Sequence, residues 1–389
     1  MDTTMKYYLL EPRDPLIIRS GRPFDEISDA EAARFPPPST LAGALRNAYA
    51  RSTGQPLNEA LRKLSVSGLL PVKLGTENKV VTVDTLMVPK PADAHYHSLD
   101  NSKDPVVSLV SATPVPLADG EGCDLPGAAL WPLQFRQTIQ GKPVSGPQWW
   151  SLKDLLAWRK DAASVSFNQV QKNGWLPAPP DIRTHIAMEN RTRSASSGQI
   201  FQTTGLNMWQ KKQPSETFPT SAIGILGGIT GAVTTQWVNL GGERRLTTIE
   251  PCESVPQPPV QWLENIAKAD GIILTLLTPA LFTMGWQPRW LNSDTLIGTL
   301  PGLEPFPLQL RAAALGRWQP HSGWNLEKRC PRPARRMVPA GSTYWFEWVG
   351  EKPSPEQIAS LWFGHVCDEH QDNLDGFGLV LPAPYDSAH

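Results

Sequence analysis

The residues that could perform acid–base chemistry are few. The chain has seven histidines, and only His185 lies in a polar, basic segment that could hold an RNA or another anion. Its imidazole could serve as a general acid or base, because an imidazole titrates near neutral pH. The sequence shows no second catalytic residue at a recognisable spacing from His185. An isolated histidine more often positions its neighbours or is simply hydrated. We therefore predict no catalytic residue.

Two groups of side chains could ligate a metal. His95 and His97 would share one face of a strand, and His365, Cys367 and His370 are close together in the sequence. Neither group has a second pair of ligands at an interval typical of zinc sites. The sequence also lacks the patterns of a serine nucleophile elbow, a Walker loop and a dinucleotide-binding turn. We expect no metal site and no cofactor.

Basic residues and glycines form segments that suit binding better than catalysis. In residues 240–245 (LGGERR), adjacent glycines would let a backbone approach a ligand chain, and Arg244 and Arg245 could fork onto phosphates. An ordinary hairpin turn is the alternative for this segment. Between Arg183 and Lys212, basic residues exceed acidic ones by four.

A second basic run lies nearer the C-terminus, in a segment that prolines keep extended. Trp318 and Trp324 lie just upstream of it. Extended arginines beside tryptophans suit single-stranded nucleic acid, because phosphates need cations and bases stack on rings. The patch could equally contact an acidic protein. Its basic residues are Lys328, Arg329, Arg332, Arg335 and Arg336.

The N-terminal segment offers a third basic group and a helix start. Arg19 precedes a Gly-Arg-Pro-Phe turn and Arg22 lies in it; this segment could also be a mixed, solvated surface. After three prolines, Ser39 and Thr40 are good N-cap residues, and apolar residues then recur at helical spacing. Two residues lie off the apolar stripe, near a helix N-terminus whose free amides favour anions, and would complete a phosphate corner: Gly43 and Arg46.

The elements that must position these groups are short. Apolar patterns predict strands over residues 6–12, 79–89, 271–278 and 343–349, and a glycine turn that enters a strand over 376–381. Helices are predicted over 152–160, after Ser151 as cap, and over 354–366. Residues 90–130 lack sustained periodicity and are predicted to be an inserted loop region. The sum is an α+β chain.

Composition limits the function classes further. The formal net charge of −1 excludes bulk basicity, although positive charge on one face could still bind a polyanion. Proline makes up 39 of 389 residues, which favours a loop-rich fold, and 15 tryptophans argue against disorder. The length fits two domains. We expect a cytoplasmic protein, because the four cysteines lack a CxxC spacing and no signal peptide or membrane segment is evident.

Two segments have a specific resemblance: residues 11–24 (EPRDPLIIRSGRPF) and 35–46 (FPPPSTLAGALR). In residue identity and spacing they look like the amino-terminal signature of the RAMP subunits that cap the 5′ handle of the crRNA in the Cmr complex, the type III-B CRISPR effector. The similarity continues through 185–193 (HIAMENRTR), 198–204 (GQIFQTT), 240–245, 335–346 (RRMVPAGSTYWF) and 376–378 (GFG). It therefore covers essentially the whole chain.

The resemblance implies a fold and a function. The fold would be two ferredoxin-like, RRM-type modules with long inserted loops, one in residues 1–220 and one in 221–389, which agrees with the α+β prediction. The function would be that of a non-catalytic crRNA-binding subunit in antiviral defence. Such a subunit caps the 5′ handle and bridges two partners, the large polymerase-like (signalling cyclase) subunit and the backbone RAMP subunit of the filament.

The resemblance also implies RNA-binding residues, carried over at matching motif positions. Those near the handle would be Arg19, Arg22, Ser39, Thr40, Gly43 and Arg46. A second, glycine-rich contact would comprise Gly241, Gly242, Arg244 and Arg245. A mobile loop over the RNA would carry His185, Arg191 and Arg193. The set is completed by the two arginines of the C-terminal run that begin a family motif, Arg335 and Arg336.

Two other functions stay open. A metal-independent RAMP endoribonuclease that processes CRISPR repeat RNA would use His185 as its acid or base. A pure interaction module would bind protein through tryptophan-rich surfaces, with RNA contact incidental.

Overall fold

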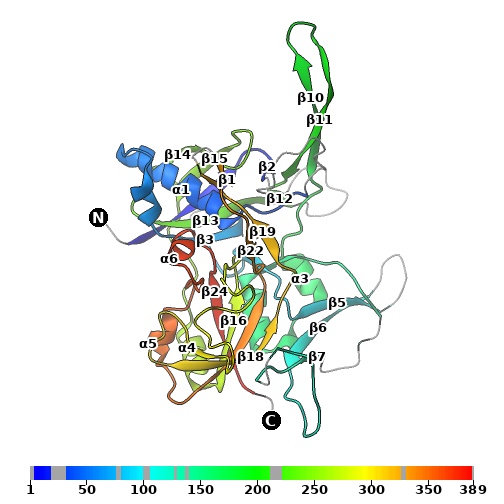
Figure 1. Cartoon of the computed structure of the whole chain (residues 1–389), viewed down its shortest axis with the longest axis vertical. Coiled ribbons are helices and arrows are strands. Elements are labelled where there is room, and N and C mark those ends of the chain that lie inside the picture. The colour runs from blue at the N-terminus through cyan, green and yellow to red at the C-terminus, as the bar shows by residue number, and fades with distance from the viewer. Residues whose placement is uncertain are drawn as a thin grey trace.

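The computed structural model describes residues 4–18, 32–75, 80–99, 106–126, 129–135, 139, 141–210, 221–325 and 330–387. Figure 1 shows two lobes stacked along the long axis of the molecule, and a long hairpin that projects from one of them. The elements are mostly short strands with a few helices, which confirms the α+β prediction. In the described part of the chain, no helix combines the length and the apolar character needed to span a bilayer.

The first lobe is built on an antiparallel sheet whose strands are far apart in sequence. Its order is β12–β13–β1–β15–β14, and β3 also pairs with β13. Apolar residues of the sheet and of α1 share one buried cluster, which includes Leu10, Leu45 and Ile225. The elements are β1 (Met5–Pro12), α1 (Pro38–Thr53), β3 (Val66–Lys73), β12 (Trp209–Gln210), β13 (Ser221–Thr230), β14 (Gln236–Asn239) and β15 (Leu246–Pro251).

Helix α1 begins one residue earlier than its expected cap. Pro37 is the N-cap and makes no side-chain cap bond, and Pro38 is the first helical residue. Proline is tolerated at that position because its missing N–H would have no intrahelical acceptor. Ser39 and Thr40 therefore lie inside the first turn, and the prediction that they cap the helix is wrong.

The sheet of the first lobe crosses the division predicted at residues 220 and 221. Strand β13 pairs with β1 from Met5↔Thr230 to Leu10↔Ile225, and β15 pairs with the other edge of β1. Both partners follow residue 220 in the sequence. A division there cuts the sheet, which stays whole only if the boundary falls after Pro251.

The second lobe contains a five-stranded antiparallel sheet in the order β17–β18–β23–β16–β24. Helices α4 and α5 pack beside it, and Ser354 and Gln357 form a capping box at the start of α5. The predicted strands over 271–278 and 343–349 are confirmed, whereas the helix predicted over 354–366 ends at Ala359. The elements are α4 (Val260–Lys268), β16 (Gly271–Leu276), β17 (Ile297–Thr299), β18 (Pro307–Ala314), β23 (Thr343–Trp348), α5 (Pro355–Ala359) and β24 (Val380–Tyr385).

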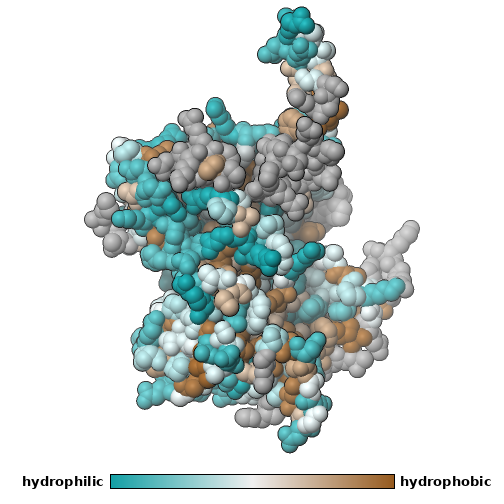
Figure 2. Space-filling view, viewed as in Figure 1, coloured by the Kyte–Doolittle hydropathy of each residue, from teal (hydrophilic) through white to brown (hydrophobic). Residues whose placement is uncertain are grey.

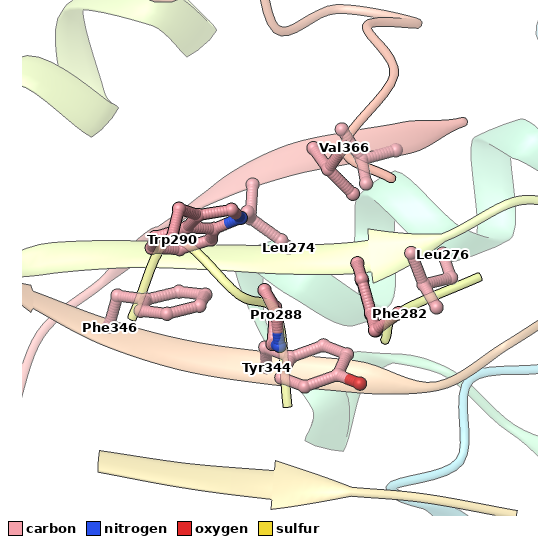
Figure 3. A pocket seen from close by; sticks show the side chains of 9 residues that line it. Leu274, Leu276, Phe282, Pro288, Trp290, Tyr344, Phe346 and Val366 are labelled. Carbon is pink, nitrogen blue, oxygen red and sulfur yellow. The ribbon is translucent and has the colours of Figure 1, made fainter. Parts of the chain in front are cut away.

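A small apolar cavity lies in the core of the second lobe (Figure 3). Its lining includes Leu274, Phe282, Trp290 and Phe346. Tyr344 also lines it, but its hydroxyl donates to the Trp286 carbonyl at 2.7 Å. The cavity is therefore a packing gap in an apolar core, without the convergent polar groups of a ligand site.

Residues 80–180 form an insertion that is more regular than expected. The region predicted as loop over 90–130 contains β5 and β6, which belong to a four-stranded sheet in the order β7–β6–β5–β8. The helix over 152–160 and its Ser151 cap are confirmed. The elements are β4 (Met87–Pro89), β5 (Ala94–Ser98), β6 (Val107–Pro114), β7 (Leu133–Phe135), β8 (Lys142–Pro143), β9 (Trp149–Ser151), α2 (Leu152–Lys160) and α3 (Phe167–Asn173).

A buried ion pair ties this insertion to the second lobe. The Arg159 guanidinium donates to both oxygens of Asp93 at 2.8 and 2.9 Å, and the Trp158 indole donates to the same carboxylate at 2.8 Å. The Thr343 hydroxyl on β23 donates to Asp93 at 3.0 Å. Burial raises the pKa of Asp93, but the charge of Arg159 and these hydrogen bonds outweigh it and hold the pKa below its usual value.

Short ribbons and helices complete the fold. The projecting hairpin is β10 (Asp181–Glu189) with β11 (Ser194–Leu206), and β11 also pairs with β2 (Leu16–Ile17). The ribbon β19–β22 lies between the two lobes in Figure 1. The remaining elements are η1 (Glu59–Lys63), η2 (Ala162–Ser164), β19 (Gln319–His321), β20 (Trp324–Asn325), β21 (Cys330–Pro331), β22 (Arg335–Met337) and α6 (His370–Leu374).

Candidate nucleic-acid interface

The base of the hairpin brings together segments that are distant in sequence. His185 on β10 has its Nε2 atom 2.9 Å from the Thr203 hydroxyl and its ring stacked on Phe201, with ring centroids 5.0 Å apart. The same Nε2 atom is 4.0 Å from a carboxylate oxygen of Glu243, in the turn 240–245. His185, expected in a loop, thus lies on a strand of a hairpin and is held by protein groups on three sides.

The turn 240–245 closes onto the end of β2. The Gly242 amide donates to the Ile17 carbonyl at 2.7 Å, and a Cβ on Gly241 would lie 2.7 Å from that oxygen. Gly241 also has a φ of +79°, which favours glycine. The close approach that these glycines permit is therefore to the protein's own backbone. The predicted Arg19 and Arg22 follow β2 and lie outside the described residues.

The arginines of this turn differ in their surroundings. Arg245 is largely buried and pairs with Glu243 at 3.0 Å. Arg244 is exposed and, within the described part of the chain, forms no ion pair with an acidic side chain. Arg244 is therefore free to meet a phosphate, whereas Arg245 supports the turn.

The hairpin carries two further arginines at its tip. Arg191 and Arg193 are exposed, and neither makes a side-chain hydrogen bond or ion pair to a residue that the structure describes. Figure 2 shows hydrophilic residues at this tip and apolar surface along the stem. The stem exposes Ile182, Ile186 and Ile200, of which Ile186 and Ile200 pair across the two strands.

A second cluster lies where α1 meets the ribbon β19–β22. The Ser39 hydroxyl is 3.5 Å from Nε2 of His321, whose ring meets Phe377 edge-on at 5.1 Å. Burial lowers the pKa of His321, and the nearby charge of Arg335 lowers it further. The imidazole is therefore neutral at neutral pH. Thr40 is half-buried beside Ser39 in the first turn of α1.

Gly43 is exposed on α1, and a Cβ built there would meet no atom within 4 Å. Nothing in the described protein packing requires glycine at this position. Glycine in a helix interior costs about 1 kcal/mol relative to alanine. Its presence fits the predicted approach of a ligand to the helix backbone.

Arg46 has a different role from the one predicted. It is 8% exposed, and its guanidinium pairs with Asp375 and donates to the Leu64 and Leu374 carbonyls at 2.8 Å each. These acceptors occupy the side chain, so it is not free to hold a phosphate. The side chain instead links α1 of the first lobe to Leu374 and Asp375, which directly precede the glycine-rich loop 376–378.

Arg335 and Arg336 point to opposite faces of the ribbon. Arg335 forks onto both oxygens of Asp372 at 2.7 Å each. Arg336 is exposed and lies over the ring of Trp318, 5.0 Å from its centroid. Arg336 therefore faces solvent, whereas Arg335 anchors the ribbon to α6.

Sequence reasoning missed several residues of these clusters. Asp372 and Asp375 bind predicted arginines from positions 37 and 329 residues away in the chain. Separations of that size leave no local signal. His321 had one signal, its place between Trp318 and Trp324 in the Pro-rich run, and Phe201 lies inside the motif 198–204.

The candidate metal ligands do not converge. His365 is half-buried, with Nδ1 2.8 Å from the Phe377 carbonyl and Nε2 3.0 Å from the Ser67 hydroxyl. The rings of His95 and His97 are 6.5 Å apart, with Phe135 edge-on to both. Among the described residues, no three histidine, cysteine or carboxylate side chains are grouped so that they could hold a metal ion.

Comparisons with known proteins give structural neighbours of low sequence identity. Two cryo-EM structures of the type III-B Cmr-beta complex, one bound to cognate target RNA and one to cognate target RNA and AMPPnP, contain similar chains. For both, the identity is 13%, coverage is 87% of this chain and 86% of that chain, and the TM-scores are 0.47 and 0.46. A chain in a Csm3–Csm4 subcomplex of the type III-A interference complex has 12% identity, coverage of 98% and 100%, and a TM-score of 0.36.

No curated protein matches the chain. The family model described as CRISPR-associated protein (Cas_Cmr3) matches residues 8–383, which is nearly the full length. The match spans both lobes, the hairpin and the glycine-rich loop, and it confirms the resemblance seen in the motifs. The chain therefore belongs to the Cas_Cmr3 family of CRISPR-associated proteins.

Proposed function

We propose that the chain is a non-catalytic crRNA-binding subunit of a type III-B CRISPR effector, the Cmr complex. In this role it caps the 5′ handle of the crRNA and bridges the large polymerase-like subunit to the backbone RAMP subunit. The observation that carries the proposal is the family match over residues 8–383. The surface chemistry supports it, because arginines without acidic partners among the described residues lie at the hairpin tip and in the turn 240–245.

We also propose that each lobe is a ferredoxin-like module. Numbered in chain order, strands β1, β3, β13 and β15 form an antiparallel sheet in the order 2-3-1-4, and β16, β18, β23 and β24 repeat that order. A ferredoxin-like β-α-β-β-α-β unit has this arrangement. The first lobe keeps the helix after its first strand (α1), and the second keeps the helix after its third (α5). The boundary then falls between β15 and α4.

The surroundings of His185 support the non-catalytic part of the proposal. Its Nε2 atom lies against the Thr203 hydroxyl and near Glu243, and its ring is stacked on Phe201. These contacts position the stem of the hairpin over the turn 240–245. A histidine that served as acid or base for RNA cleavage would need its nitrogen directed at the substrate.

Three exposed arginines test the RNA contact directly: Arg191, Arg193 and Arg244. Replacing all three by glutamine should lower the affinity of the purified full-length chain for handle RNA by about tenfold to hundredfold. The affinity for single-stranded RNA of other sequences should fall by the same factor, because phosphate contacts carry no sequence information. Because each lost phosphate contact on a single strand removes about 0.7 from the salt slope, the slope of log affinity against log salt should fall by about 2. Filter binding at several salt concentrations measures both.

The matched control removes three cations that the structure places in surface ion pairs outside the hairpin and the turn 240–245, of which two are exposed and one is half-buried. They are Arg62, Lys153 and Lys268, which pair with Glu59, Asp84 and Glu264. Their replacement by glutamine should leave the salt slope unchanged. Equal losses in the two triple variants would mean that binding follows overall charge, and the assignment of the arginines would be wrong.

A further inference from the structure

Trp318 is unusual among the tryptophans of this chain. Of the tryptophan side chains that the structure describes, those of Trp237 and Trp318 are exposed, at 41% and 50%, and the others are buried or half-buried. A large aromatic ring that stays in solvent forgoes the stabilisation that burial would give. An exposed ring on an ordered ribbon is therefore a candidate contact for a partner.

The surroundings of Trp318 are strongly basic. Arg336 lies over its ring, and Arg317 and Arg332 lie in the same stretch of chain. None of these three arginines forms an ion pair with a described acidic side chain. The described residues between 315 and 337 include no aspartate or glutamate. Beside the flat apolar ring of Trp318 the ribbon therefore carries the positive charge of Arg336, which no described acidic side chain neutralises.

The pairing of the ribbon separates an anchored face from a free one. His321 pairs with Arg335, and Pro320 with Arg336. Since side chains alternate between the faces of a strand, His321 and Arg335 share one face, and Arg336 shares the other with Trp318. The first face is fixed by Asp372 and Phe377. The ribbon that carries Trp318 is thus already ordered before a partner binds. The entropy cost of ordering this segment on binding is therefore low.

From this juxtaposition we propose that Trp318 is a stacking platform for an unpaired base of single-stranded RNA, with Arg336 holding a neighbouring phosphate. Bases stack on aromatic rings whatever their identity, and their phosphates require cations within about a Debye length. The proposal rests on the proposed function, that the chain binds crRNA, and adds the residue that holds a base.

Trp237 provides an internal comparison. Arg13 lies over its ring at 4.7 Å, so the pair has the same geometry as Trp318 and Arg336. Its charge environment differs. Trp237 pairs with Thr248 on β15, which pairs in turn with Glu11 on β1, so an acidic residue lies two strands away on the same face. An acidic group at that distance lies within about a Debye length of the ring and makes it a poorer site for a polyanion.

The test compares Trp318→Leu, Trp318→Phe and Trp237→Leu in the full-length chain, by fluorescence anisotropy with labelled handle RNA. Trp318→Leu should bind about tenfold to hundredfold more weakly, which is the typical loss when one base–aromatic stack is removed. Its salt slope should not change, because no charge is lost. Trp318→Phe should retain most of the affinity, and Trp237→Leu all of it. Urea unfolding curves should coincide for the three variants and the wild type.

Four outcomes would overturn the assignment, and they point to different errors. Equal losses for Trp318→Leu and Trp237→Leu, or no loss for Trp318→Leu in a wild-type background that binds RNA, would refute the platform alone. Failure of the wild type to bind RNA would refute the proposed function as well. Tight binding of a poly-glutamate peptide that depends on Trp318 and excludes RNA would make the patch an acidic-protein contact.

Discussion

Replacing Asp93 by alanine is expected to lower the free energy of unfolding by about 3–5 kcal/mol. The reason is that Arg159 would keep its charge in a buried site without its partner. The two side chains are 2–3% exposed, and the Arg159 guanidinium would retain only the Thr275 and Thr343 hydroxyls, at 3.0 and 2.9 Å. Urea denaturation of the purified protein measures the loss.

Two comparisons separate this effect from a general effect of charge removal. Asp84→Ala breaks the exposed pair with Lys153 and should cost less than about 1 kcal/mol. Replacing the buried pair together, as Asp93→Leu with Arg159→Met, should recover most of the loss, because no unpaired charge is left behind. An Asp93→Ala variant as stable as the wild type would show that the network is absent in solution.

The Asp93–Arg159 pair also makes the stability of the protein depend on pH, and the direction of that dependence follows from the pKa of Asp93. Its contacts hold the pKa of Asp93 below the unfolded value of about 3.9. The stabilisation is therefore fully present above the unfolded pKa, and it is lost as the pH falls through the folded one. The stability difference between wild type and Asp93→Ala should shrink below about pH 4.

Replacing Arg46 by alanine should reduce stability while leaving RNA contact intact. The change leaves Asp375 buried without its cation and removes the link between α1 and the residues that directly precede the glycine-rich loop, at a cost of about 3–5 kcal/mol. The salt slope of RNA binding by the folded fraction should stay at the wild-type value, since the side chain faces protein acceptors. Urea denaturation and salt-dependent filter binding measure the two quantities.

Arg244→Ala is the matched control for Arg46. Arg244 is exposed and unpaired among the described residues, so its loss should change stability by less than about 0.5 kcal/mol but lower the salt slope. The opposite pattern, in which Arg46→Ala is stable but loses RNA, would contradict the structural role given to Arg46.

The elements predicted best from the sequence are those whose burial follows a local period. Strands β16 and β23 read as apolar runs, and α1 and α2 show apolar residues at helical spacing. Strands β5 and β6 escaped prediction because Pro, Asp and Ser flank them and their sheet forms only through tertiary pairing. The pairing of β13 and β15 with β1 is equally invisible, since no local pattern specifies which distant strand is adjacent.

The sequence predicted which segments form the candidate site, but it did not predict which residues in those segments face solvent and which bind other protein groups. Family motifs pointed to the turn 240–245 and to the hairpin, and the structure joins them through Glu243 and His185. The motifs could not distinguish arginines that face solvent from arginines that bind carboxylates. Arg46 and Arg335 meet Asp375 and Asp372, whereas Arg191 and Arg244 do not meet any described acid. That distinction depends on long-range packing.

The most direct test of the account is a crosslinking measurement on the assembled complex. The tagged chain is purified from its host with its bound partners, irradiated with ultraviolet light, and the RNA crosslinked to this chain is sequenced. The account predicts crosslinks concentrated in the repeat-derived 5′ end of the crRNA, with the large polymerase-like subunit co-purified. Crosslinks confined to the guide or target portion, or a chain recovered without RNA, would contradict it.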